Sequence, residues 1–287
     1  MVSARTRLML QVLPLAVVLL LFFVVPLLVV VAVSFFHYDD MGLVPAFTFE
    51  NYAFVLKSGL TYELYLSMIK FAALTWAITL LLGFLVAYFL VFHVRNKLIG
   101  IGLFLICTVP FWTSNIIRMI SWLPLLGKQG LINSALIHAG LITQPLQFLL
   151  FSDFSVVCSY VHIFTIFMIV PIFNSMSRID RALFEAARDA GLSRFETMLR
   201  VVIPLTKNGI ALGSIFVITL VMGDFYIVKV LSGGGSASIV SAVYDDISTL
   251  LFPQAAAHSV FLIIIVMLMV GLILRVVDVR KELVDRR

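Results

Sequence analysis

Few residues of this chain could do chemistry, and the clearest is a carboxylate inside an apolar run. Asp224 follows Gly223 in a segment that we expect to form a membrane-spanning helix over about 209–231. A charged group at membrane depth is costly unless it is paired or hydrated, so it marks a functional candidate. Asp224 would attract a cation, and Phe225 or Tyr226 would offer it an aromatic face. The alternative is an acid near the membrane surface that reaches water or bonds to a neighbouring helix.

A second polar stretch lies between Pro110 and Trp122, inside another apolar run. Pro110 frees a backbone carbonyl and can bend a helix, and three hydrogen-bonding residues, Thr-Ser-Asn, follow at 113–115. These groups could line a path for a polar solute, with Trp112 as a stacking surface and Asn115 as a hydrogen-bonding group. The alternative is a kinked helix whose Trp112 and Trp122 anchor near the membrane interface.

No pattern typical of catalysis or nucleotide binding appears. Ser232–Ser236 (SGGGS) lacks the lysine and hydroxyl of a phosphate-binding loop, so we expect a flexible loop there. The five histidines are too scattered for a metal site, and Cys107 and Cys158 fall inside apolar spans. We therefore expect a protein that is not an enzyme and holds no cofactor or metal. If ATP drives it, another chain must bind ATP and Mg.

The composition defines the class of protein that must position these residues. Of the 287 residues, 62% are hydrophobic and 12% are charged, which no soluble core requires. The apolar runs have the length of membrane-spanning helices rather than the short alternation of a barrel. We predict six spans, at about 9–35, 62–92, 98–122, 155–176, 209–231 and 258–277, in an all-α membrane protein.

The connecting segments complete this topology. The first run is too long for a signal peptide and has no clear cleavage site, so we expect it to be retained. Residues 36–61 form an external loop, and 123–152 form short interfacial or external helices. The external acids (Asp39, Asp40, Glu50, Glu63, Asp153, Asp245 and Asp246) would favour cations, or a docking protein, or simply water.

Basic residues set the orientation. Of the 20 Lys and Arg residues, 15 fall on one side of the predicted spans: Arg5, Arg7, Arg95, Lys97, Arg178, Arg181, Arg188, Arg194, Arg200, Lys207, Arg275, Arg280, Lys281, Arg286 and Arg287. Positive charge favours the cytoplasm, so we expect both termini and the segment 178–207 to be cytoplasmic. The positive net charge is then an orientation signal and requires no nucleic acid.

The segment 178–207 is the most patterned polar stretch of the chain. Asp180 is a good N-cap for a helix over 181–190, and Gly191 suits the position after its end. Ser193 and Glu196 form a capping box, which begins a second helix towards residue 203. Pro204 limits that helix or begins the next one with a bend. The pattern predicts two helices joined by a sharp glycine turn.

The same segment resembles the EAA loop of ABC importer membrane subunits. Glu185-Ala186-Ala187, Gly191 and Val201-Val202-Ile203-Pro204 follow the pattern E-A-A-x3-G-x9-I-x-L-P, with Val201 in place of Ile and Ile203 in place of Leu. The resemblance implies that Glu185, Ala186, Ala187, Gly191 and Pro204 couple this chain to a cytoplasmic ATPase, so we call the segment 178–207 the coupling loop. The alternative is an ordinary amphipathic cytoplasmic loop.

The resemblance implies a type I ABC importer permease fold, with residues 1–287 as one permease domain in the bacterial cytoplasmic (inner) membrane. The implied partners are a cytoplasmic ATPase dimer, a second permease (homologous or identical), an extracytoplasmic substrate-binding protein and membrane lipid. The stretch from Pro110 to Arg118 and the stretch from Gly223 to Gly234 look like segments of spermidine/putrescine permeases, although Ser232 stands where that family often has glycine.

The resemblance therefore favours a polyamine such as putrescine or spermidine as the solute. Related permeases carry amino-acid derivatives, opines, phosphonates or ferric ion. An ATP-independent channel or secondary transporter would show more paired buried charges or repeated broken helices, and it would leave the 185–204 pattern unexplained.

Overall fold

The computed structural model describes residues 4–39, 42–94, 96–180 and 182–276, and they are mostly helical. Several predicted features lie outside the described residues: Arg95, Asp40, Arg181 at the start of the coupling loop's first helix, Val277 at the end of the sixth span, and the charged C-terminal tail. The chain divides into two compact units. One comprises residues up to Glu63 together with Ile239–Ile265, and the other comprises Leu64–Ser238 together with residues from Val266.

The first unit begins with a long apolar helix and continues into a small hairpin. Its elements are α1 (Ala4–Leu19), η1 (Leu20–Val24), α2 (Val25–Val33), β1 (His37–Asp39), β2 (Gly42–Val44), α3 (Glu50–Lys57), α14 (Ile239–Ser248) and the first half of α15 (Phe252–Val276). The two strands pair antiparallel, with Tyr38 opposite Leu43. The Asn51 side chain donates to the carbonyls of Ser34 (3.0 Å) and Phe36 (2.8 Å), which fixes α3 to the end of α2. The hairpin and α3 were not predicted.

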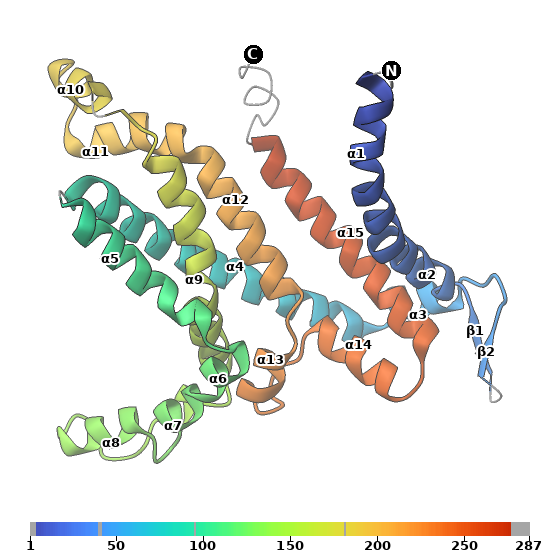
Figure 1. Cartoon of the computed structure of the whole chain (residues 1–287). Helices are drawn as coiled ribbons and strands as arrows, with labels where there is room; N and C mark the ends of the chain where they lie inside the picture. Colours follow the sequence, from blue (N-terminus) through green and yellow to red (C-terminus); the bar gives the residue numbers. More distant parts are fainter. Residues whose placement is uncertain (1–3, 40–41, 95, 181, 277–287) are drawn as a thin grey trace. The chain divides into compact units, whose positions relative to one another are not determined.

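The second unit contains the coupling loop and both polar stretches. Its elements are α4 (Gly59–Tyr88, mostly in this unit), η2 (Phe89–His93), α5 (Lys97–Thr108), η3 (Val109–Trp112), α6 (Asn115–Ile120), α7 (Trp122–Leu126), α8 (Leu131–His138), η4 (Gln147–Leu149), α9 (Asp153–Met176), α10 (Ala182–Asp189), α11 (Arg194–Thr197), η5 (Met198–Val202), α12 (Ile203–Met222) and α13 (Tyr226–Leu231). Helices α9 and α12 run side by side, and α10 and α11 lie at one end of them (Figure 1).

Five helices among the described residues are long and apolar enough to cross a membrane: Gln11–Val33, Gly59–His93, Asp153–Met176, Arg194–Met222 and Phe252–Arg275. A bent pair, Leu98–Trp112 with Asn115–His138, makes a sixth if it is counted as one span. These helices match the predicted apolar runs to within a few residues at most ends, with two exceptions.

The first exception is the fifth span, which the sequence placed at about 209–231. The apolar helix instead runs over Arg194–Met222 and ends before Asp224. The prediction was wrong because the capping box starts a helix that continues past Pro204. The backbone N–H of Ile203 bonds to the carbonyl of Met198, five residues back, in a wide π-helical turn. This wide turn accommodates a proline that would clash with an α-helical carbonyl.

The second exception is the third span, predicted as one kinked helix over about 98–122. The helix tightens into η3 at Pro110, then stops, and the next helical segment leaves at 93°. The Thr113 hydroxyl donates to the Pro110 carbonyl (2.8 Å), which satisfies a carbonyl at the break. Short helices α7 and α8 follow, as expected for residues 123–152.

The packing of the second unit depends on close approach at three glycines. A Cβ at Gly209 would lie 2.5 Å from the carbonyl oxygen of Pro171, and one at Gly213 would lie 2.7 Å from the sulfur of Met168. A Cβ at Gly83 on α4 would lie 2.7 Å from the same Met168 side chain. Met168 is completely buried. Helices α4, α9 and α12 therefore meet around one methionine, at distances that only glycine permits.

We predict that Gly209→Ala destabilises the protein by about 1–3 kcal/mol, because the added methyl meets a backbone carbonyl that cannot move aside. Gly271→Ala is the matched control, since Gly271 lies in α15 with nothing within 4 Å of an added Cβ. Thermal unfolding of the detergent-solubilised protein would measure both. Equal melting temperatures for the two variants would contradict this account of the packing.

Candidate coupling and solute sites

The first helix of the coupling loop has defined caps at both ends. The Asp180 carboxylate accepts the N–H of Ala182 (3.0 Å), as predicted for an N-cap. Gly191 has φ +79°. Its N–H bonds to the carbonyl of Arg188 (2.9 Å), and the N–H of Leu192 bonds to that of Ala187 (3.0 Å). These two bonds are those of a Schellman motif, which satisfies the last carbonyls of α10 and turns the chain sharply.

The second helix begins with the predicted capping box. The Ser193 hydroxyl accepts the N–H of Glu196 (3.2 Å), and the Glu196 carboxylate accepts the N–H of Ser193 (3.0 Å). Arg200 lies 3.7 Å from the same carboxylate, one helical turn later. Local hydrogen bonds, together with the Glu196–Arg200 ion pair, thus stabilise the loop from Asp180 to Arg200 and define the turn between its two helices.

The three residues of the predicted E-A-A motif on α10 differ in exposure. Ala187 is buried, whereas Glu185 and Ala186 are exposed. The Phe184 ring packs on Phe92 with ring centroids 4.7 Å apart, which attaches α10 to η2. Beside it is a groove of about 270 Å³ lined by Tyr88, Phe184, Glu185, Arg188, Leu192, Arg194 and Thr197. A carboxylate and two guanidinium groups face this groove, so it can bind a partner through polar contacts.

Asp224 lies in the break between α12 and α13, not within a helix. Its Oδ1 accepts the backbone N–H of Ile227 (2.9 Å), and the Tyr160 hydroxyl donates to the same oxygen (3.3 Å). The carboxylate therefore begins α13 and bonds to α9, a neighbouring helix, which is one of the alternatives that the sequence left open. Both hydrogen bonds fall on Oδ1, and Oδ2 accepts none from the residues that the structure describes.

The two aromatic residues after Asp224 form a pair. The rings of Phe225 and Tyr226 have centroids 4.4 Å apart, and Tyr226 is 51% exposed. Together with Asp224, they form a group with a carboxylate and aromatic faces, which we call the Asp224 group. This combination can bind an organic cation.

The other predicted path residues lie at the break in the third span. Trp112 ends η3 and is 84% exposed, so its ring is open to a ligand, to lipid or to another subunit. Asn115 begins α6, and its side-chain oxygen accepts a hydrogen bond from Arg118. Arg118 is buried, and Nε and Nη1 of its guanidinium have no hydrogen-bond partner among the described residues. Asn115 is thus already engaged with an internal cation that the sequence did not single out.

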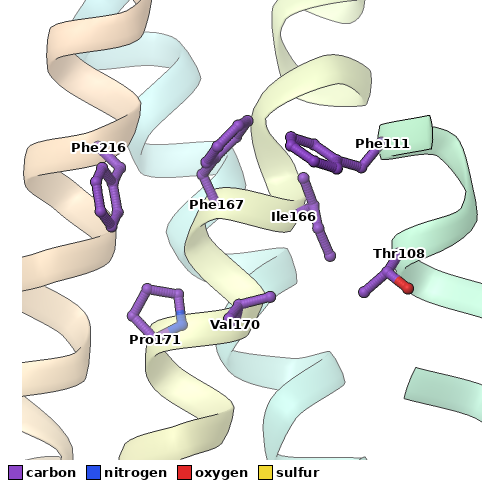
Figure 2. A pocket seen from close by; sticks show the side chains of 7 residues that line it. All are labelled: Thr108, Phe111, Ile166, Phe167, Val170, Pro171 and Phe216. Carbon is purple, nitrogen blue, oxygen red and sulfur yellow. The ribbon is translucent and has the colours of Figure 1, made fainter. Parts of the chain in front are cut away.

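An apolar pocket of about 220 Å³ lies beside this break (Figure 2). Three phenylalanines from different elements border it, Phe111 of η3, Phe167 of α9 and Phe216 of α12, together with Thr108, Ile166, Val170 and Pro171. The rings of Phe111 and Phe167 pack edge to face, 5.7 Å apart. The pocket can hold an apolar group, and its lining supplies no charge.

Several acids of the predicted external face have partners inside the chain. Lys70 Nζ lies 2.5 Å from Asp153 Oδ2, and the Ser236 hydroxyl donates to Asp153 Oδ1 (2.5 Å). His37 Nδ1 lies 3.0 Å from Glu50 Oε2. The SGGGS segment is therefore anchored to α9 through Ser236, rather than being a free tether. Within the described residues, no group of three His, Cys, Asp or Glu side chains could hold a metal ion.

Several helices of membrane-spanning length, together with an exposed pair of short capped helices, define a multi-pass membrane protein. The family model described as "Binding-protein-dependent transport system inner membrane component" matches residues 94–287. The chain belongs to this family, and it is the permease component of an ABC importer in the inner membrane.

Named relatives extend the similarity to most of the chain. It is 34% identical over 241 residues to the spermidine/putrescine transport system permease protein PotB of Salmonella typhi, which covers 83% of each chain. PotB of Escherichia coli K12 is 33% identical over 241 residues, covering 83% of this chain and 86% of that protein. The inner membrane ABC transporter permease protein YdcU of Escherichia coli K12 is 28% identical over 255 residues, covering 84% and 80%.

Solved structures show the same fold. A bacterial ABC transporter involved in the import of the acidic polysaccharide alginate aligns with a TM-score of 0.71 at 17% identity, covering 94% of each chain. The alginate transporter in complex with its pentasaccharide-bound periplasmic protein aligns equally well, with 93% and 92% covered. At this identity the likeness concerns the fold alone.

Asp246 of α14 gives a test of electrostatics. Burial and the neighbouring charge of Asp245 raise the pKa of Asp246 to about 6, and its Oδ2 lies 3.8 Å from Nε2 of His258. Because the pKa is raised in the folded state, protonation stabilises that state. We predict that the free energy of unfolding rises by about 1–2 kcal/mol as the pH falls from about 7 to 4.5. This range allows for solvent screening of the partly exposed carboxylate. Asp246→Asn should lack this pH-dependent rise. Thermal unfolding across pH would measure it; parallel curves for the two proteins would contradict it.

Proposed function

We propose that this chain is the membrane-spanning permease of an ATP-driven importer for a small cationic solute, with a polyamine as the leading candidate. The single observation that carries the coupling assignment is the rigid, exposed helix pair of the coupling loop, closed by the Schellman motif at Gly191 and opened again by the Ser193 capping box. A rigid helix pair of this kind can transmit movement to the spans, whereas a mobile loop would not. ATP and Mg are bound and ATP is hydrolysed by a separate cytoplasmic ATPase dimer.

The whole chain, residues 1–287, acts in this proposal as one permease domain with six spans and cytoplasmic termini. The bent pair around Thr113 supplies the sixth span, and the distribution of basic residues supplies the orientation. A second permease, homologous or identical, completes the pore. Lipid and that second subunit cover the apolar helices. The span Gln11–Val33 is one of them, and none of its side chains is buried within the chain itself.

In the proposed cycle, closure of the ATPase dimer moves α10, and the movement passes into the spans. The exposed Glu185 and Ala186 and the adjoining groove meet the ATPase, while the buried Ala187 and the Phe184–Phe92 contact attach α10 to this chain. The π-helical turn accommodates Pro204, so α11 and α12 remain one continuous helical segment. An extracytoplasmic substrate-binding protein delivers the solute; the alginate transporter was solved in complex with such a protein, bound to its pentasaccharide.

The polyamine assignment rests on the names of the relatives and on the chemistry of the Asp224 group. A carboxylate with one oxygen left for a cation, next to Tyr226, suits a primary ammonium. Trp112 and the residues around Asn115 supply further surface on the solute path. The competing proposals are the same importer with another solute, such as an amino-acid derivative, an opine, a phosphonate or ferric ion, and an ATP-independent channel or secondary transporter.

Reconstitution separates these candidates. The chain would be purified with its native neighbours, placed in proteoliposomes, and ATP hydrolysis recorded while the substrate-binding protein, loaded with putrescine, spermidine or another solute, is titrated in. Stimulation by a polyamine-loaded protein supports the whole proposal. Stimulation by another solute alone retains the importer and removes the polyamine. Failure of any ATPase to associate would overturn the coupling assignment.

Substitution of Gly191 tests the coupling loop directly. We predict that Gly191→Ala lowers transport and stimulated ATP hydrolysis severalfold with normal membrane insertion, because alanine at φ +79° costs about 1 kcal/mol or more and opens the turn. Gly191→Asn should retain more activity, since asparagine tolerates this conformation. Glu185→Ala, at an exposed position, should reduce transport without reducing stability.

Gly140→Ala is the matched control for Gly191→Ala. Gly140 closes α8 with φ +72° and the same pair of hydrogen bonds, from Gly140 N to Ile137 O and from Leu141 N to Leu136 O. The same strain is therefore introduced away from the coupling loop. Normal transport and stimulated ATP hydrolysis in both the Gly191 and the Glu185 variants would contradict the assignment. A loss of transport in Gly140→Ala equal to that in Gly191→Ala would also contradict it.

Substitution of Asp224 tests the solute site. We predict that Asp224→Asn raises the KM for putrescine or spermidine uptake by roughly tenfold or more, because a charge-assisted contact to the ammonium is replaced by a neutral one. Uptake of radiolabelled solute by cells carrying the complete importer would measure it, with Asp245→Asn as the control acid. Unchanged uptake in the Asp224 variant would remove this residue from the path.

A further inference from the structure

The carboxylate of Asp224 depends on a helix that lies far from it in the sequence. One donor to Oδ1 is local, the N–H of Ile227, and it fixes the carboxylate relative to α13. The other donor is the hydroxyl of Tyr160, on α9, 64 residues earlier. The carboxylate is therefore tied both to its own break and to the central helix of the second unit.

Tyr160 is held rigidly. Its side chain is 1% exposed, so the ring occupies one position in the core. It stacks on Phe164 of α9, with centroids 5.7 Å apart, and meets Phe71 of α4 edge to face at 6.4 Å. Among these packed rings, the hydroxyl is the polar end, and it points at Asp224. A buried hydroxyl of this kind is a fixed donor rather than a mobile surface group.

We propose that Tyr160 is a positioning residue for solute binding. It holds Oδ1 of Asp224 so that Oδ2 is presented to a primary ammonium group of the solute. This inference rests on the proposed role of Asp224 in binding a cation. Its physical basis is that two donors on one oxygen fix the plane of the carboxylate, so the second oxygen meets a cation without a search over rotamers.

The structure also indicates why the sequence could not show this role. Tyr160 lies in an apolar run with aromatic residues at helical spacing, where a tyrosine is expected to be a core side chain. Its packing is indeed that of a core residue, and only the position of its hydroxyl against Asp224 distinguishes it. Removal of the hydroxyl alone therefore separates the positioning role from the packing role.

The test is Tyr160→Phe in the complete importer, with putrescine and spermidine as probes. The phenyl ring keeps the contacts with Phe71 and Phe164, so the variant should reach the membrane at the wild-type level. We expect KM for uptake to rise about threefold to tenfold with maximal rate nearly unchanged. The effect should be smaller than that of Asp224→Asn because the O–H···O distance of 3.3 Å is long for a hydrogen bond.

Tyr52→Phe is the control variant, because Tyr52 also loses a hydroxyl hydrogen bond, here with Ser34 (2.6 Å) in the first unit. Its KM should be that of the wild type. A purely structural role for Tyr160 would lower the amount of inserted protein and leave KM unchanged, which would overturn the inference. A wild-type KM for Tyr160→Phe together with a raised KM for Asp224→Asn would also overturn it. Wild-type uptake in both variants would instead remove the proposed solute site itself.

Discussion

The contact between α9 and α12 is the constraint on which the rest of the second unit depends. The two helices approach until the backbone of Gly209 meets the carbonyl of Pro171 and Gly213 meets Met168. In a membrane, where no hydrophobic force drives helices together, such close approach of small residues is a principal source of attraction. Because the coupling loop connects these same two helices, their fixed contact provides its base. The same pairing brings Tyr160 to the place where α12 ends and Asp224 follows.

The continuity of the helix from Arg194 to Met222 gives the proposed mechanism its physical form. Its 29 residues give a length of about 44 Å measured along the helix axis, at 1.5 Å per residue. Pro204 would ordinarily break such a helix, but the π-helical turn over Met198–Val202 keeps the chain helical up to the proline and beyond it. The capping box thus lies at one end of a continuous helical segment, which changes direction between α11 and α12 (Figure 1), and Asp224 lies just beyond the other end. Under the proposed function, displacement of the coupling loop would reach the solute site without passing through a flexible joint.

Local chemistry explains which predictions from the sequence were confirmed. The caps at Asp180, Gly191 and Ser193 depend on residues within five positions of one another, so the sequence contained them completely. The apolar runs likewise identified the membrane helices, since length and hydropathy are local properties. The predictions failed where a helix could either continue or stop. Pro204 was expected to limit a helix or to begin the next one with a bend, and it stands in the first turn of α12 with the helix continuous before it. The break after Trp112 was expected to be a kink. In both cases the outcome depended on which turn type the neighbouring carbonyls could satisfy.

The sequence by itself determined the class of protein, the family, the caps of the coupling loop and the residue types of the Asp224 group. Each follows from composition, from spacing along the chain or from a motif. Tertiary structure alone decided which distant groups meet: that Tyr160 donates to Asp224, and that Asp153 binds both Lys70 and Ser236. These partners lie on different parts of the chain, 64 residues apart in the first contact and 83 in the other two. Their meeting depends on helix packing, which glycines at positions of close approach permit and which periodicity does not specify.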